Sequence, residues 1–186
     1  MRVILAPDKF RGSLTARQVT NAMEEAVRHV WPDAELVALP LADGGEGTAQ
    51  VLTEATSGTW HTAVVSDPLG RPVEAGFGQS GDGRTAFIEM AAASGLSLLT
   101  HDERRTVQTS TFGTGELIRH AIDRGVGHVV LAIGGSATTD AGIGMASALG
   151  WEFLDGQGKP LRAIGQSLPR LARIVAPAVS YQRPLY

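Results

Sequence analysis

The residue types best suited to chemistry lie in short segments that connect an expected strand to an expected helix. The clearest segment, 133–142, reads Ile-Gly-Gly-Ser-Ala-Thr-Thr-Asp-Ala-Gly. Gly134 and Gly135 allow the backbone to bend and approach a ligand closely, and unpaired N–H groups at a helix start favour an anion. Ser136 and Thr138 add hydroxyl donors. The segment therefore predicts a phosphate or carboxylate site.

Asp140 is the carboxylate near the end of this segment. Carboxylate oxygens are ligands that Mg²⁺ prefers, so Asp140 is a candidate metal ligand. Aspartate is also a frequent helix cap, and the alternative is a strand-to-helix turn that Asp140 caps. The pattern is neither a Walker A motif, which needs Gly-Lys followed by Ser or Thr, nor a dinucleotide-binding fingerprint.

A second segment, Ala42–Thr48, combines two carboxylates with three glycines. Ligands of parallel α/β sheets gather at the carboxyl ends of the strands, where this loop is expected. Asp43 and Glu46 suit a metal ion, a substrate hydroxyl or general-base catalysis. Alternatively, they are acidic residues that stabilise the N-terminus of the following helix.

A third segment, Pro7–Ser13, follows the first expected strand and carries charges of both signs. Asp8 occupies a position typical of a catalytic carboxylate. Lys9 and Arg11 suit the neutralisation of a phosphate or a substrate carboxylate. The alternative is a solvated surface loop.

Two further regions have a mainly structural interpretation. Segment Thr109–Glu116 is rich in hydroxyl groups and glycine, and we expect it to cap the following helix, with Glu116 completing the capping interaction. Glu89 ends an expected strand beside small residues and is a weaker functional candidate. The five histidines lack the spacing of metal ligands, so we expect surface or packing roles for them.

Hydrophobic periodicity predicts alternating strands and helices that would position these segments. Strands are expected over Val3–Ala6, Glu35–Leu39, Thr59–Val65, Val73–Phe77, Thr85–Glu89, Val129–Ile133 and Trp151–Leu154. Helices are expected from a cap at Ser13 or Thr15 to Val30, and over Gly47–Ala55, Gly115–Arg124, Asp140–Leu149 and Leu168–Val175. Turn signals at Asp67–Gly70 and Gly81–Gly83 favour an antiparallel meander between α/β units.

The composition narrows the class of protein. The 186 residues include 23 glycines, and no apolar run reaches the ~18 residues of a membrane span. The absence of cysteine excludes disulfides and thiolate metal sites and agrees with a reducing cytoplasm. The first 155 residues carry a net charge of −8 and the last 31 carry +5. Such a split indicates either a basic tail for nucleic acid or membrane, or a chain that ends before its partner segment.

Taken together, the segments resemble the bacterial type I glycerate kinase family from Met1 to about Ile174. The matching stretches include Ala6–Asp8, Ala42–Thr48, Asp67–Gly70, Ile88–Leu96, Gly113–Ile118 and Ile133–Asp140. The resemblance implies an α/β fold with a Rossmann-like parallel sheet that has helices on both faces, plus a smaller mixed α/β segment containing a short antiparallel meander. It also implies transfer of the γ-phosphate of ATP to a hydroxyl of D-glycerate, with Mg²⁺ as cofactor.

The same resemblance brings the three charged and glycine-rich segments into one cleft. Carried over onto matching positions, it places Asp8, Asp43, Glu46, Ser136 and Asp140 in that cleft, whereas Lys9 and Arg11 stand where the family usually has Ser and Lys. Our working hypothesis gives catalytic roles to Asp8, Asp43 and Arg11 and places Asp140 near Mg²⁺. The substrate and phosphate contacts in this hypothesis are Lys9, Ser13, Glu46, Gly134, Gly135, Ser136 and Thr138.

Members of the family are about twice as long as this chain. We therefore expect the N-terminal half of such a kinase, doubtful in activity on its own, with a Rossmann-like part at 1–58, an incomplete mixed domain at 59–174 and an unrelated tail at 175–186. The expected partners are D-glycerate and ATP, without nucleic acid or membrane, in the cytoplasm. Uncovered apolar faces predict self-association. The alternative is a small non-catalytic protein that binds a carboxylate or a phosphate.

Overall fold

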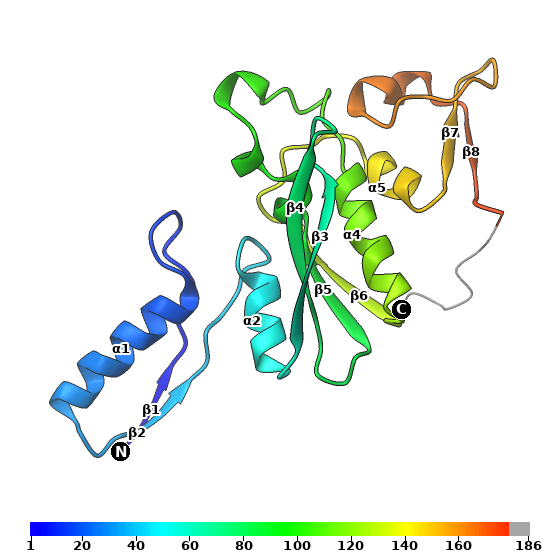
Figure 1. Ribbon diagram of the computed structural model, residues 1–186. Helices are drawn as coiled ribbons and strands as arrows, with labels where there is room; N and C mark the ends of the chain where they lie inside the picture. The colour runs from blue at the N-terminus through cyan, green and yellow to red at the C-terminus, as the bar shows by residue number, and fades with distance from the viewer. Residues whose placement is uncertain (179–186) are drawn as a thin grey trace.

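The N-terminal βαβ unit consists of β1 (Arg2–Leu5), α1 (Ala16–Val30) and β2 (Glu35–Ala38). The computed structural model describes residues 1–178. Strands β1 and β2 pair in parallel, and Figure 1 shows this unit set apart from the larger part of the molecule. The side-chain hydroxyl of Thr15 accepts the backbone N–H of Gln18 in a capping box, so α1 begins at one of the two expected caps and ends at Val30 as expected.

A four-stranded mixed sheet forms the centre of the larger part. It contains β3 (Thr59–Ser66), β4 (Pro72–Gln79), β5 (Thr85–Glu89) and β6 (His128–Ala132), in that order. The first three strands are antiparallel neighbours, which confirms the meander, and β6 pairs in parallel with β5. The carboxyl end of β5 therefore lies beside the glycine-rich segment that follows β6.

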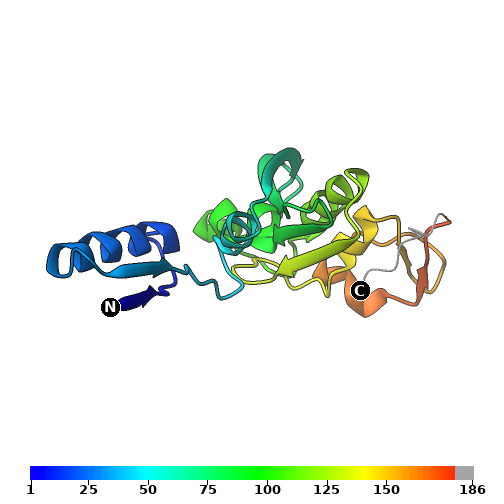
Figure 2. The same ribbon diagram turned by 90° about the horizontal axis from the view of Figure 1, so that it is seen from below.

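Helices cover both faces of this sheet. Figure 1 shows α2 (Thr48–Ala55) on one side of β3–β5 and α4 (Phe112–Asp123) on the other. A Cβ on Gly78 of β4 would overlap the hydroxyl of Thr53, so glycine is what lets α2 lie close to the sheet. Phe77, the neighbour of Gly78, is fully buried on the α4 side. The expected α/β class is thus confirmed, but the sheet with helices on both faces is the mixed one. The parallel pair β1–β2 packs against α1 on one face only within residues 1–178 (Figure 2).

The hydrophobic core lies between this sheet and α4. Its buried side chains come from β3, β4, β5, the segment 90–94, α4 and the turn before β6. They are Val65, Ala75, Phe77, Ala86, Ile88, Ala93, Leu117, Ile118, Ala121 and Val126. Helix α2 also belongs to this part by its packing, because it packs against β3, β4 and β5. The division of the chain after residue 58 stays a prediction.

The remaining elements are short; three lie between β5 and α4 in the chain, and the others come after β6. They are α3 (Met90–Ser94), η1 (Leu96–Leu98), η2 (His101–Glu103), α5 (Ile143–Ala148), β7 (Glu152–Leu154), η3 (Gly165–Arg170) and β8 (Arg173–Val175). The expected short helix over Leu168–Val175 is wrong, because the helical turn ends at Arg170 and β8 pairs antiparallel with β7. Residues 179–186 of the expected tail lie outside the described residues. Within residues 1–178, no helix is long and apolar enough to span a bilayer.

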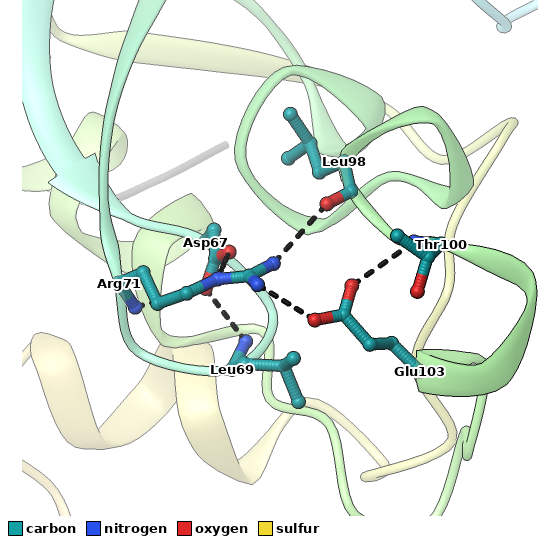
Figure 3. A network of polar contacts seen from close by, with 6 residues as sticks. All are labelled: Asp67, Leu69, Arg71, Leu98, Thr100 and Glu103. Carbon is teal, nitrogen blue, oxygen red and sulfur yellow. Dashed lines mark hydrogen bonds and ion pairs between the residues drawn. The ribbon is translucent and has the colours of Figure 1, made fainter.

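A polar network ties the β3–β4 turn to η2 (Figure 3). The buried Asp67 carboxylate accepts hydrogen bonds from the backbone N–H groups of Leu69 and Arg71 and from the Arg71 side chain. The same guanidinium donates to Glu103 at 2.7 Å. Burial of Asp67 alone would raise its pKa, but the Arg71 and Leu69 hydrogen bonds outweigh burial and hold the pKa below the usual 3.8.

This network predicts a component of acid stability that depends on Asp67. A depressed folded-state pKa stabilises the native state above the unfolded pKa of about 3.9, and the contribution is lost as pH falls through the folded value. Asp67→Asn should therefore be less stable than the parent at pH 6, and the difference should shrink as pH falls below the unfolded pKa and through the lowered folded-state pKa of Asp67. Urea unfolding at several pH values measures the effect. The exposed Asp33→Asn is the matched control, and an unchanging Asp67→Asn deficit would contradict the prediction.

Candidate functional site

The first loop of the site follows β1 and presents its polar residues at a tight turn. Phe10 and Leu14 form an isolated antiparallel bridge, and Gly12 between them has φ of +74°. That left-handed conformation favours glycine and places Arg11 and Ser13 at the tip of the turn. This turn is therefore formed by contacts within residues 10–14, just before α1 begins.

The second loop joins the first through a charge pair. The Lys9 ammonium donates to Asp43 Oδ1 at 2.6 Å and lies 3.8 Å from Asp8 Oδ1. This hydrogen bond, reinforced by the backbone N–H of Gly45, lowers the pKa of the Asp43 carboxyl below 3.8. The structure therefore brings together Asp8, Lys9 and Asp43, three of the expected site residues.

A cavity of about 350 Å³ opens between the two loops, α1 and α2. Its lining includes Asp8, Lys9, Arg11, Ser13 and Glu46, all expected site residues. The volume is at the lower end of the range for small-molecule pockets. With Thr15, Arg17 and Glu54, which also line the cavity, three cationic side chains, two hydroxyls and three carboxylates surround it. This mixture suits a small anion that also carries hydroxyl groups.

The glycine-rich loop after β6 lies against the second loop and is not part of the cavity lining. The N–H of Gly134 donates to the carbonyl of Gly44 at 2.8 Å. A Cβ on Gly134 would come within 2.7 Å of the Gly45 Cα, so this close approach requires glycine. Farther along, the hydroxyls of Ser136 and Thr138 are 2.8 Å apart. Gly134 thus connects the loops, and its N–H is already used within the chain.

The surroundings of Asp140 do not fit a magnesium site. Asp140 is 2% exposed. Its carboxylate accepts hydrogen bonds from the backbone N–H and hydroxyl of Thr111, and from the N–H groups of Gly142 and Gly144. No cluster of three or more His, Cys, Asp or Glu side chains among residues 1–178 has the arrangement of a metal site. Asp140 instead holds the start of α5 against the loop before α4, as the capping alternative anticipated.

Glu89 has a larger role in this region than its sequence pattern indicated. It ends β5, and its carboxylate accepts the N–H of Ala49 at 2.8 Å, so it caps α2 from another element. Burial raises the pKa of Glu89 above 4.5, and the nearby Glu46 raises it further, while hydrogen bonds from Ala49 and Gly47 act against the rise. The sequence signals for this position were a carboxylate at the end of a buried strand and the small residues beside it.

The expected capping role of Glu116 is wrong. Its carboxylate accepts the backbone N–H of Ser66 at 2.6 Å, and the N-cap residue Thr111 makes no side-chain cap hydrogen bond. The reason is that Ser66, at the end of β3, has a donor within reach of α4. Glu116 therefore joins α4 to the sheet instead of closing its own helix end.

Several known proteins with similar sequences are described as glycerate kinases. A sequence model of the glycerate kinase family matches residues 3–182, which extends past Ile174, where the resemblance was expected to end. The chain is 51% identical to a glycerate kinase of Haemophilus influenzae over 174 residues, which are 94% of this chain and 46% of that protein. It is 47% identical to the glycerate 2-kinase of Escherichia coli over 171 residues, 92% of this chain and 45% of that protein.

A solved structure agrees with these sequences. The crystal structure of a protein from Salmonella typhimurium LT2, described as a glycerate kinase 2, aligns with a TM-score of 0.84 at 50% identity. The alignment covers 94% of this chain and 46% of that one, so the chain spans about half the length of the relatives it matches. Because the family model matches nearly the whole sequence, the chain belongs to the glycerate kinase family.

Proposed function

We propose that this chain contributes the substrate-binding part of a glycerate kinase, which transfers the γ-phosphate of ATP to a hydroxyl of D-glycerate and gives phosphoglycerate. The observation that carries the proposal is the cavity beside β1, where Asp8, Lys9, Arg11 and Ser13 are lining residues. D-Glycerate is a small carboxylate with two hydroxyls, and its groups match this mixture of cations, hydroxyl and carboxylate. The proposal also places the reaction in the cytoplasm, where ATP is available.

Arg11 is the proposed partner of the substrate carboxylate. A guanidinium forms paired hydrogen bonds with a carboxylate, and Arg11, at the tip of its turn, is one of the residues that line the cavity. Lys9 and Ser13 add a second positive charge and a hydroxyl for anionic oxygens. Glu46, on the α2 side of the cavity, is the proposed acceptor for a substrate hydroxyl.

Asp8 and Asp43 are proposed to orient the hydroxyl that receives the phosphate. The lowered pKa of Asp43, caused first by the Lys9 hydrogen bond, makes this carboxylate a weak proton acceptor. Positioning is the main protein contribution to phosphoryl transfer, since the transition state needs alignment more than proton removal. The Lys9–Asp43 pair therefore favours an orienting role for Asp43 over general-base catalysis.

The phosphates of ATP are proposed to approach Gly134–Thr138, where Gly135, Ser136 and Thr138 offer the remaining backbone and hydroxyl donors. Mg²⁺ is part of the proposal as the ion that accompanies ATP, because it is typically held by phosphates, waters and only one or two carboxylates. Asp140 is not proposed as its ligand, since the Asp140 oxygens already accept four hydrogen bonds.

Arg11→Met should weaken the binding of D-glycerate by at least about tenfold, because it removes a charge-assisted hydrogen bond to the carboxylate. Titration calorimetry of the 186-residue chain with D-glycerate measures this change. Arg28→Met, at the exposed end of α1, is the matched control and should bind as the parent does. Equal affinity of the parent and Arg11→Met would contradict the assigned role.

A non-catalytic carboxylate- or phosphate-binding protein is the second candidate function. It is favoured by the fact that the lining of the cavity comes entirely from residues 8–54. A coupled assay with D-glycerate and MgATP separates the two. Formation of phosphoglycerate supports the kinase, whereas D-glycerate binding without turnover supports the second candidate.

A further inference from the structure

Helix α2 begins without a side-chain cap of its own. Its N-cap residue, Gly47, has φ of +89°, and its first turn contains no acidic residue. The first N–H groups of a helix have no partner within the helix and favour a nearby negative charge. That charge comes from β5, because the Glu89 carboxylate accepts the N–H of Ala49 at 2.8 Å and a hydrogen bond from the N–H of Gly47. The start of α2 is therefore held by a residue 40 positions farther along the chain.

Glu89 also lies where two loops of the site meet the sheet. It is the last residue of β5 and the register partner of Ala132, the last residue of β6. Just after β6, the glycine-rich loop donates a backbone hydrogen bond to the carbonyl of Gly44. The second loop is thus held at Gly44 from the end of β6 and at Gly47 from the end of β5. Glu46 lies between these two attachments.

The start of α2 matters because this helix forms one wall of the cavity. The lining residues on this side are Glu46, Gly47, Gln50, Val51 and Glu54. On the opposite face of the helix, Ala49 and Thr53 are buried where α2 packs on the sheet. Glu89 is not a lining residue, so its effect on a ligand passes through the wall that it holds.

The charges around Glu89 favour a role at the site. Burial is the main cause that raises the pKa of Glu89 above 4.5, and the like charge of Glu46 adds to the rise. The hydrogen bonds from Ala49 and Gly47 and the charge of Lys9 lower the pKa but do not cancel the rise. The surroundings therefore disfavour the ionised form of Glu89, and carboxylates perturbed in this way are concentrated at functional sites.

We propose that Glu89 is a positioning residue, which holds Glu46 and the first turn of α2 in place as one wall of the cavity. This inference rests on the proposed function, in which Glu46 accepts a hydroxyl of D-glycerate. A carboxamide at position 89 could still accept the N–H of Ala49, whereas an alanine could not. Loss of the anchor moves Glu46 away from the ligand and leaves Arg11, on the first loop, in its place.

Calorimetric titration of the 186-residue chain with D-glycerate tests this role. Glu89→Ala should weaken binding at least about tenfold, and Glu89→Gln should stay within about threefold of the parent, because its side-chain oxygen replaces the acceptor. Thr53→Ala is the matched control, since it removes a buried hydroxyl from the opposite face of the same helix and should lower stability without changing affinity. Binding of D-glycerate by the parent and by Glu89→Ala with equal affinity overturns the inference and leaves the proposed function intact.

Double-mutant cycles distinguish positioning from a general loss of structure. Glu46→Gln should weaken D-glycerate binding at least about tenfold in the parent but less than about twofold in Glu89→Ala, because the displaced Glu46 no longer reaches the ligand. Arg11→Met should cost the same factor in both backgrounds, because Arg11 belongs to the first loop, which is held by its own turn. Equal costs of Glu46→Gln in the two backgrounds would make the role of Glu89 purely structural and overturn the inference.

Hydrogen exchange separates this inference from the proposed function. The amides of Gly47 and Ala49 should exchange at least about tenfold faster in Glu89→Ala than in the parent, and Glu89→Gln should restore protection of the Ala49 amide. If this pattern is found but the parent binds no D-glycerate, the proposed function fails and the positioning of the wall stands. Unchanged exchange of both amides overturns the positioning. Glu89→Asp, whose side chain is shorter by one CH₂, replaces Glu89→Ala in each experiment if the alanine variant does not fold.

Discussion

Asp140→Ala should lower the free energy of unfolding by about 3–5 kcal/mol, as expected when a buried group that satisfies several partners is removed. In the variant, four donors lose their acceptor: the N–H and the hydroxyl of Thr111, and the N–H groups of Gly142 and Gly144. For a chain of this length, each kcal/mol lowers the Tm by about 2–4 °C, so the loss should reach about 10 °C. Thermal unfolding followed by circular dichroism measures it.

Two comparisons separate this role from metal binding. Asp102→Ala, which removes a fully exposed carboxylate, should leave the Tm unchanged within about 1 °C. Mg²⁺ should not raise the Tm of the parent, because only an ion that binds the native state raises the Tm, by an amount that grows with the logarithm of the ion concentration above its Kd. Near-normal stability of Asp140→Ala, together with a Tm of the parent that rises with Mg²⁺, would show that Asp140 is a metal ligand after all.

Gly134→Ala should separate the two loops that meet behind the cavity. The new Cβ would lie 2.7 Å from the Gly45 Cα and 2.8 Å from the Gly44 oxygen, which are both backbone atoms that cannot rotate away. Relief of this overlap breaks the Gly134–Gly44 hydrogen bond and moves the loop that carries Asp43. Overpacking of this kind destabilises a protein by about 1–3 kcal/mol. We expect that loss, and D-glycerate affinity reduced at least about tenfold.

Gly156→Ala provides the control for Gly134→Ala. A Cβ on Gly156 meets nothing within 4 Å, and its φ is not in the left-handed region, so stability and binding should stay at parent values. Chemical unfolding and calorimetric titration on both variants give the comparison. Normal D-glycerate binding by Gly134→Ala would show that the contact between the loops does not matter for the cavity.

The parts of the fold that depend on local sequence could be predicted. Helix α1 has apolar residues at helical spacing and a capping box within four residues, so its start at Thr15 and its end at Val30 follow from neighbours in the chain. The antiparallel meander likewise follows from turn residues such as Asp67 and Gly70. In both cases the stabilising contacts are made between residues close together in the sequence.

Contacts between distant residues set the limits. Asp140 bonds with Thr111, 29 positions away, and Glu116 with Ser66, 50 positions away. Periodicity carries no signal for such pairs, so the sequence left Asp140 as a candidate metal ligand or helix cap and predicted a capping role for Glu116. Strand β8 was not predicted for the same reason, because its strand conformation depends on pairing with β7.

The candidate site was predicted as a set of loops, and its internal arrangement was not. Strand geometry placed the loops containing Lys9 and Asp43 only at the carboxyl ends of their own strands. The resemblance to the glycerate kinase family is why these loops were expected to meet in one cleft. The Lys9–Asp43 hydrogen bond spans 34 positions, and the sequence does not say which oppositely charged neighbours will pair. Glu89 was undervalued because its partner, the N–H of Ala49, carries no side-chain signal at all.

Two ion pairs link the N-terminal βαβ unit to the Asp43 loop and to α2, so ionic strength should affect how these parts are held together. Lys9 bonds with Asp43 at the cavity, and Arg17 on α1 bonds with Glu54 on α2 at 3.0 Å, with both side chains largely exposed. An exposed pair such as Arg17–Glu54 weakens as salt shortens the Debye length from about 30 Å at 0.01 M to about 8 Å at 0.15 M, whereas the Lys9 side chain is only 18% exposed and its pair is screened less. The spacing between α1 and α2, and with it the width of the cavity, should therefore respond to the buffer.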